Sequence, residues 1–256
     1  MGLSVFDHVT IRVSDLTDAR RCYELALGSL GYGEPATDGH FYEWEDFSIS
    51  RAREERLPTR NLHVGFVAHS PEEVDEWWRT MTGAGYRDDG RPGPRPQYSP
   101  SYYGAFVRDP DGNSVEAVHH DKPREGENRI DHLWIRVRDL AASRRFYEAV
   151  APAVGLRVHD GAENRFHVTD GSRSFALVRE DPVTENVHLA FPAPDLQTVE
   201  AFHRAALAAG APDNGAPGER PEYHPGYYGA YALDPDGNNV EAVWHDRQGD
   251  LAGAGM

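Results

Sequence analysis

An internal duplication constrains the fold of this chain more than any other feature. The segment YYGAFVRDPDGNSVEAV at residues 102–118 returns as YYGAYALDPDGNNVEAV at residues 227–243, which is 125 positions later in a chain of 256 residues. Such a repeat predicts two tandem modules of ordinary domain size. We place the modules at residues 1–121 and 130–246, with a polar linker at residues 122–129 and a flexible Gly- and Ala-rich tail at residues 247–256.

The order of predicted elements is the same in both modules and occurs twice within each. Residues 7–13 and 131–137 alternate polar and apolar side chains, as a strand with one buried face does. A helix capped by Asp15 or Asp139 and two or three short strands follow, and the order then begins again. We therefore expect an α+β fold of four βαβββ units in two paired modules, each with a curled mixed sheet around a cavity and with helices outside.

Composition limits the kinds of partner. The formal charge of −16 disfavours nucleic acid and anionic membranes, because both bind basic surfaces. We find no apolar run near the ~20 residues that cross a bilayer, and no export signal at the start. Cys22 is the single cysteine, so an internal disulfide cannot form, which suits a reducing compartment. We expect a cytoplasmic monomer or homodimer that binds a small molecule.

Ligand-type side chains face inward on three strands of each module. On every such strand the apolar residues must cover the helices, so the alternate residues face the concave side of the sheet. These inward residues are His8, His63 and Glu116 in the first module and His132, His188 and Glu241 in the second. A buried, unpaired carboxylate costs several kcal/mol, so it needs a cation or a strong donor. Two imidazoles and one carboxylate predict a divalent-metal site with open coordination positions.

The spacing of these residues supports the same prediction. The two histidines are 55 residues apart in the first module and 56 in the second, and in both modules the glutamate follows 53 residues later. Among the 13 histidines, His120 and His245 also occupy matching positions, and we interpret them as residues at the rim of the site.

These motifs resemble those of the vicinal oxygen chelate superfamily. The shared features are Asp-His on the first strand, a histidine in an apolar strand before a capped helix, and Asp-Pro-Asp-Gly-Asn-x-x-Glu near the end of the module. That superfamily includes glyoxalase I, extradiol dioxygenases, methylmalonyl-CoA epimerase, fosfomycin-resistance enzymes and bleomycin-binding proteins. The resemblance implies a metal that chelates adjacent oxygens of a substrate. It implies one ligand set within each module, or an exchange in which His8 joins His188 and Glu241.

The reaction is less constrained than the site. Two histidines and one glutamate suit Fe2+ first, with Mn2+, Ni2+, Co2+ or Zn2+ as alternatives. Extradiol enzymes that resemble this chain carry an acid–base histidine where it has Ser48 and Arg173, and the basic pocket of fosfomycin-resistance enzymes is not evident. We expect a metal-dependent dioxygenase or a glyoxalase-like lyase or isomerase acting on a small oxygenated substrate. The alternative is a non-catalytic protein that sequesters a drug or metabolite.

Two arginines are candidates for contact with the substrate. Arg12 and Arg136 lie four residues after the first-strand histidines and on the same strand face. A guanidinium there can hold a substrate carboxylate or pair with an acid on a neighbouring strand. Trp134 occupies the place that Thr10 has in the other copy, so the two cavities should differ in shape.

Tyrosines are the remaining candidates. One tyrosine of each Tyr-Tyr pair should face the cavity, and we assign Tyr103 and Tyr228 to this role as hydrogen-bond or proton donors. Tyr231 joins them because extradiol enzymes resembling this chain place a tyrosine ten residues before the glutamate. The first module has Phe106 at that position.

Overall fold

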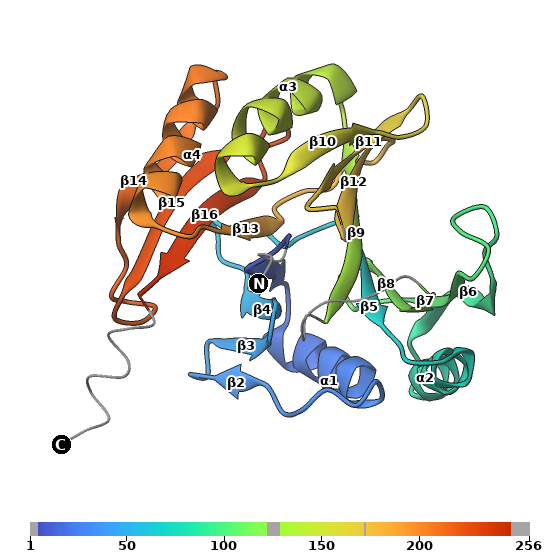
Figure 1. The fold of residues 1–256 in the computed structure, drawn as a ribbon. Helices are drawn as coiled ribbons and strands as arrows, with labels where there is room; N and C mark the ends of the chain where they lie inside the picture. The colour runs from blue at the N-terminus through green and yellow to red at the C-terminus, as the bar shows by residue number, and fades with distance from the viewer. Residues whose placement is uncertain (1–4, 122–128, 172, 247–256) are drawn as a thin grey trace.

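The computed structural model describes residues 5–121, 129–171 and 173–246, and these residues form four successive βαβββ units (Figure 1). The prediction of an α+β fold is confirmed. The predicted tail and residues 122–128 of the predicted linker lie outside the described residues. In the described part of the chain, none of the helices combines the length and the apolar character that a membrane crossing requires.

The units have the following elements. The first contains β1 (His8–Val13), α1 (Leu16–Gly28), β2 (Ala36–Thr37), β3 (Phe41–Trp44) and β4 (Phe47–Arg51). The second contains β5 (His63–Val67), α2 (Pro71–Gly83), β6 (Arg87–Pro94), β7 (Tyr103–Arg108) and β8 (Ser114–His119). The third contains β9 (Ile130–Val137), α3 (Leu140–Val150), the 3-10 helix η1 (Ala151–Val154), β10 (Arg157–Asp160), β11 (Arg165–Thr169) and β12 (Ser174–Arg179). The fourth contains β13 (His188–Pro192), α4 (Leu196–Ala208), β14 (Asp213–Glu219), β15 (Tyr227–Leu233) and β16 (Asn239–His245).

Each sheet combines one unit from each half of the chain. The first and fourth units form a sheet with the order β14-β15-β16-β13-β1-β4-β3-β2, and the third and second form one with the order β10-β11-β12-β9-β5-β8-β7-β6. The units meet through antiparallel pairs, β1 with β13 and β5 with β9. Each of the two predicted modules, residues 1–121 and 130–246, thus contributes strands to both sheets.

The helices, in contrast, pair within each copy. α1 packs against α2, and α3 packs against α4, and the two helix pairs lie at opposite ends of the molecule in Figure 1. The Trp77 indole N–H of α2 donates to the carbonyl of Ala26 in α1 at 3.0 Å. α1 and α3 begin at aspartate caps as the sequence predicts, because the Asp15 and Asp139 carboxylates accept hydrogen bonds from the first free backbone N–H groups.

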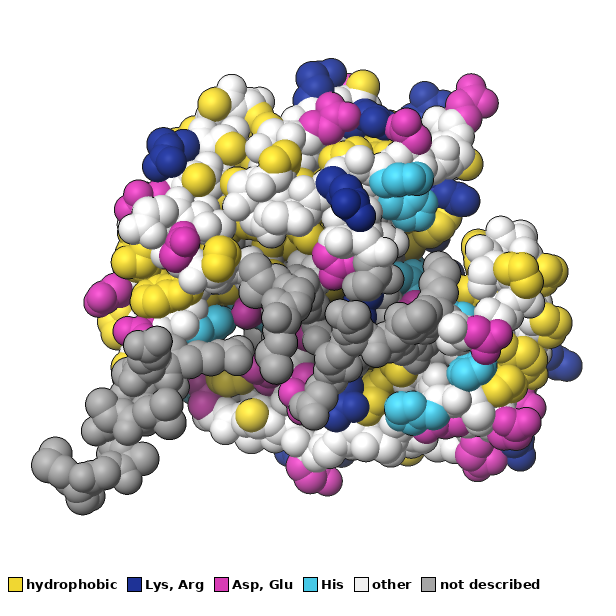
Figure 2. All heavy atoms as spheres, viewed as in Figure 1, with side chains coloured by type: hydrophobic (Ala, Val, Ile, Leu, Met, Phe, Trp, Pro, Cys, Tyr) yellow, Lys and Arg dark blue, Asp and Glu magenta, His cyan; other side chains and the backbone are white. Residues whose placement is uncertain are grey.

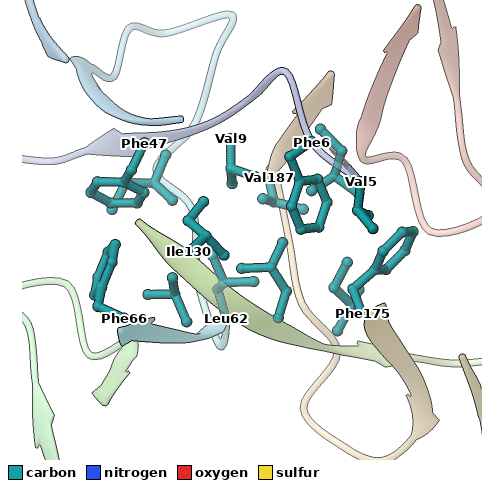
Figure 3. Packing of buried hydrophobic residues seen from close by; sticks show 14 of the residues in the cluster. Val5, Phe6, Val9, Phe47, Leu62, Phe66, Ile130, Phe175 and Val187 are labelled. Atoms are coloured by element: carbon teal, nitrogen blue, oxygen red, sulfur yellow. The ribbon is translucent and has the colours of Figure 1, made fainter. Parts of the chain in front are cut away.

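Phenylalanines from both sheets meet in the core between them (Figure 3). Phe47 of β4 and Phe66 of β5 are fully buried and contact each other edge to face, with ring centroids 5.0 Å apart. Phe6, just before β1, and Phe175 of β12 make a second aromatic contact between the sheets, with ring centroids 5.4 Å apart and ring planes tilted by 40°. The two sheets therefore contact each other through this core, and the helix pairs α1–α2 and α3–α4 add further contacts.

Replacing Phe66 with leucine should lower the free energy of unfolding by about 1–2 kcal/mol, because the change keeps most of the volume but loses the aromatic edge contact with Phe47. Denaturant unfolding followed by circular dichroism measures this change. Leu57 is 58% exposed, so Leu57→Ala serves as a control that should change stability by less than about 0.5 kcal/mol. Equal effects of the two substitutions would contradict the role given to Phe66.

Charged side chains of both signs lie scattered over the face shown in Figure 2, instead of gathering in one basic patch.

Candidate metal centres

The structure brings the six predicted ligands together in two groups, each drawn from both copies. His63, Glu116 and His132 form the first group, called centre A here, and His8, His188 and Glu241 form the second, called centre B. The grouping by sequence module does not occur, because each sheet joins one unit of each copy. The exchange that moves His8 to His188 and Glu241 is the arrangement found.

Centre A has the geometry of a facial ligand set. The Nε2 atom of His63 lies 3.0 Å from Oε2 of Glu116 and 3.1 Å from Nε2 of His132, and the His132 and Glu116 atoms are 3.3 Å apart. Ligand atoms about 2.1 Å from a metal and at right angles to one another are about 3 Å apart, so the three atoms fit one divalent ion. Two imidazole nitrogens and a fully buried carboxylate supply the donor types that such an ion prefers.

Two glycines make room for these side chains. Gly65 of β5 lies between His132 and Glu116 in the strand register, and a Cβ at this position would come within 2.5 Å of Cε1 of His132. A Cβ on Gly104 of β7 would collide with Oε1 of Glu116. The absence of side chains at both positions is therefore a condition for the arrangement of centre A.

Centre B is more open. His188 Nε2 lies 2.9 Å from Glu241 Oε2, but His8 Nε2 is 3.8 Å from the same oxygen. The His8 and His188 rings are stacked, with centroids 5.1 Å apart and planes 9° from parallel. His8 faces Ala190 across the strand pair, in the place where His132 faces Gly65. A side chain is thus present in centre B where centre A has none.

An aspartate next to each first-strand histidine orients that ring. His132 Nδ1 donates to Asp131 Oδ1 at 2.9 Å, which leaves Nε2 as the atom that faces centre A. Asp131 also accepts from His120 Nε2 at 2.8 Å. The pair that sequence comparison placed at the rim, His120 and His245, therefore contacts the orienting aspartates.

Asp7 plays the same part in centre B. It accepts from His8 Nδ1 at 2.9 Å and from His245 Nε2 at 3.0 Å, and His245 in turn is hydrogen-bonded to His224 at 2.9 Å. From the sequence, Asp-His was recognised only as part of a motif, and the role of the aspartate in orienting the histidine ring was not predicted. The signal was present, because both copies keep Asp immediately before the histidine.

The tyrosine that reaches each glutamate is the first of each Tyr-Tyr pair. Tyr102 donates to Glu116 Oε1 at 2.8 Å, and Tyr227 donates to Glu241 Oε1 at 2.6 Å. Tyr103 instead donates to Asp75 of α2 at 2.8 Å. The assignment of Tyr103 is thus corrected: the alternation of β7 turns it toward the helix.

Tyr228 is likewise placed away from centre B and packs against a small apolar cluster with Val199 of α4. Tyr231 does lie at centre B, with its ring centroid 6.2 Å from that of His188. Its hydroxyl is buried near Glu241 and Tyr227. Of the three tyrosines chosen from the sequence, the structure therefore brings only Tyr231 to a centre.

A cavity of about 620 Å³ adjoins centre A, and the three ligands of that centre line it. Its wall includes five arginines, Arg95, Arg108, Arg136, Arg165 and Arg173, together with four carboxylates, Asp89, Glu116, Asp131 and Glu180. His167 and Trp134 also line it. Sequence comparison between the copies passed over Arg165 and His167, since the other copy has no matching residue.

The two arginines predicted from the sequence differ in their surroundings. Arg136 lines the cavity of centre A, and its Nη2 atom is 3.6 Å from Oε1 of Glu180. Arg12 lies on β1 and its Nη1 atom is 3.5 Å from the carbonyl oxygen of Asn186. Burial lowers the pKa of Arg12 from its ordinary value, and the nearby Arg56 lowers it further.

The protonation of centre A follows from burial and from pairing. Burial lowers the pKa of His63, and Glu116 only partly offsets this effect. Burial also acts to lower the pKa of His132, but hydrogen bonds with Asp131 and Glu116 outweigh it and raise the value to about 10. Burial acts to raise the pKa of Glu116, yet the hydrogen bonds with both histidines bring it below its usual range. Glu116 is thus an anionic donor at neutral pH.

The sequence and the fold of this chain were compared with those of known proteins. Residues 31–117 and 129–242 match the family model described as the glyoxalase/bleomycin resistance protein/dioxygenase superfamily. No curated protein sequence matches the chain.

Two solved structures illustrate the shared fold. Glyoxalase I from Zea mays is 20% identical, with 97% of this chain and 94% of that chain covered and a TM-score of 0.65. A Bacillus subtilis protein provisionally named a dioxygenase is 11% identical, with 95% and 86% covered and a TM-score of 0.63. At these identities the likeness establishes the fold alone.

Proposed function

Because the chain belongs to the glyoxalase/bleomycin resistance protein/dioxygenase superfamily, we propose that it is a metal-dependent enzyme that acts on a small oxygenated substrate at centre A. The observation that carries this proposal is the facial set of His63, Glu116 and His132, whose ligand atoms lie 3.0–3.3 Å apart beside a cavity of about 620 Å³. These residues would hold one divalent ion, Fe2+ first, with Mn2+, Ni2+, Co2+ or Zn2+ as alternatives. The second group, His8, His188 and Glu241, has the same ligand types and would hold a second ion.

The residues around centre A orient the metal ligands and can accept a proton from the substrate. When bound, the metal supplies Lewis acidity toward a carbonyl or a pair of adjacent oxygens. Tyr102 holds one oxygen of Glu116 and so directs the other toward the centre, while Asp131 fixes the ring of His132. His167 and Glu180 line the same cavity and are side chains that can accept a proton from a bound substrate.

Among the reactions of this superfamily, we favour a glyoxalase-like lyase or isomerase over ring cleavage. The position of an extradiol acid–base histidine is Ser48 in one unit and Arg173 in another. Ser48 has a hydroxyl that is hydrogen-bonded to Thr10 at 2.7 Å, and Arg173 has a guanidinium, which offers donors and no acceptor, so neither supplies the base that ring cleavage needs. Dioxygenase chemistry with Fe2+ remains the second candidate, because the facial His/His/Glu set suits it.

Metal analysis tests the proposal directly. Elemental analysis of protein purified without added metal should show one or two equivalents of a divalent ion, and a chelator should remove activity that the same ion restores. The activity panel should include 2-oxoaldehyde thiol adducts for isomerisation and catechols with oxygen uptake for ring cleavage. Metal-free protein that binds small molecules tightly and catalyses neither reaction would contradict the proposal and support sequestration.

Asp131→Asn should weaken metal binding at centre A by about tenfold to a hundredfold, because outer-sphere partners of ligating histidines contribute that much. The amide can present an N–H to His132 Nδ1 and then no longer fixes Nε2 as the ligand atom. Competitive titration with a metal indicator measures the affinity. Asp160→Asn on the exposed strand β10 is the control, and equal affinities for the two variants would show that Asp131 has no orienting role.

A further inference from the structure

We infer that the substrate of centre A carries a carboxylate at its end remote from the metal, and that Arg136 and Arg165 bind this group. The inference rests on the proposed function and names the substrate class of the same site. It also separates the two centres, because centre B has only one of the two arginines.

Strand register places both arginines at one level of the cavity wall. Arg136 of β9 pairs with Val178 of β12, and Val178 pairs with Arg165 of β11. His132 and Arg136 face the same side of β9 four residues apart, and a strand rises about 3.3 Å per residue, so their Cα atoms are about 13 Å apart. A molecule of modest size can therefore reach from the metal ligands to the arginine pair.

The hydrogen-bonding capacity of this pair is not used up by the protein. The Nε atoms of Arg136 and Arg165 are buried and have no hydrogen-bond partner among the described residues. Arg136 has Glu180 at 3.6 Å, which is longer than a hydrogen bond, and Arg165 lies over the Trp134 ring at 5.1 Å from its centroid. Guanidinium groups with unfilled donors on a cavity wall match a carboxylate, which offers two acceptor oxygens.

Two of the other arginines of the cavity, Arg95 and Arg108, are more fully occupied. Arg108 forms an ion pair with Asp89 at 2.8 Å and donates to the carbonyl of Gly112. Arg95 donates to the backbone carbonyls of Pro94 and Arg91. With Glu180 beside Arg136, the pair Arg136 and Arg165 carries a net charge near +1, which suits a monoanionic carboxylate better than a dianionic phosphate.

Centre B differs at the corresponding places. Arg12 of β1 pairs with Ser50, and Ser50 pairs with Phe41 of β3, so Phe41 stands where centre A has Arg165. Two residues earlier on β1, Thr10 pairs with Ser48, and Ser48 pairs with Glu43. The residues at the places of Thr10 and Glu43 in centre A are Trp134 and His167. Phe41 and Glu43 in place of Arg165 and His167 do not favour an anionic substrate.

The test compares an acid with its neutral amide. Calorimetry under nitrogen would measure the binding of 3-(3,4-dihydroxyphenyl)propanoate and its primary amide to Zn2+-loaded protein, whose metal content is determined separately. We expect the acid to bind at least about tenfold more tightly than the amide. Arg136→Gln and Arg165→Gln should each remove most of this preference and leave the affinity for the amide unchanged, while Arg12→Gln should leave the preference intact.

Glu180→Gln gives a change of opposite sign, which damage to the fold would not produce. Removing this competing carboxylate should increase the preference for the acid about threefold. Equal binding of acid and amide to the wild type, or an equal loss in Arg12→Gln and Arg136→Gln, would overturn the inference. Tighter binding of the corresponding phosphonate than of the acid would overturn the carboxylate assignment.

A metal-independent arm separates this inference from the proposed function. It uses 3-phenylpropanoate and its amide with metal-free protein. A preference for the acid in protein that takes up no metal would contradict the proposed function and support carboxylate binding by Arg136 and Arg165. Zn2+ uptake at centre A without any preference for the acid would contradict carboxylate binding by the arginines and leave the proposed function in place.

Discussion

Replacing Glu116 with alanine is expected to remove one equivalent of bound metal and to lower activity about a thousandfold. The metal contributes several kcal/mol to catalysis of this type, and each 1.36 kcal/mol is a factor of ten in rate. Glu116 is the anionic donor of centre A, with the Nε2 atoms of His63 and His132 at 3.0 and 3.3 Å from its Oε2. Without it, only the imidazoles of His63 and His132 remain to hold the ion.

The duplication provides the matched control. Glu241 has the same burial, the same tyrosine contact and the same place in the repeat as Glu116. Glu241→Ala should also lose one equivalent of metal but should change activity only a few-fold, because the arginine-lined cavity adjoins centre A. Elemental analysis and initial rates measure both effects, and circular dichroism shows whether each variant is folded. Full activity in Glu116→Ala together with loss in Glu241→Ala would assign catalysis to centre B.

The duplication made the ligands predictable but not their grouping. Strand alternation shows that His8, His63 and Glu116 face inward, because the opposite face must cover helices. It does not show which units share a sheet, and both sheets here combine units from different copies. That choice depends on pairing between strands far apart in the chain, such as β1 with β13, for which local sequence gives no signal.

Comparison of the copies also finds what they share and passes over what differs. Asp131 and Tyr102 were within the repeated motifs, yet strand alternation decides which tyrosine reaches the centre: Tyr102 faces it, as Phe106 does four residues later, whereas Tyr103 faces α2. The choice of Tyr103 over Tyr102 failed for this reason. Arg165, on the other hand, has no counterpart in the other copy, and such unmatched residues distinguish one cavity from the other.

One difference between the copies lies within the centres themselves and can be exchanged. Gly65 faces His132 in centre A, whereas Ala190 faces His8 in centre B. The Nε2 atom of the first-strand histidine is 3.3 Å from the glutamate oxygen in centre A and 3.8 Å in centre B. The tighter centre is thus the one without a side chain at this position.

Gly65→Ala should therefore weaken metal binding at centre A by a hundredfold or more. A Cβ at residue 65 would lie 2.5 Å from Cε1 of His132, and ordinary contacts between carbon atoms are about 3.5–4.0 Å, so the ring must move by about 1 Å. A displacement of this size in a ligand or catalytic group costs on the order of a hundredfold. The reverse change, Ala190→Gly, should strengthen binding at centre B, because it gives His8 the space that His132 has. Metal titration of the two variants beside the wild type measures both changes, and a Gly65→Ala protein with unchanged affinity at centre A would show that the ring of His132 is not held where metal binding requires it.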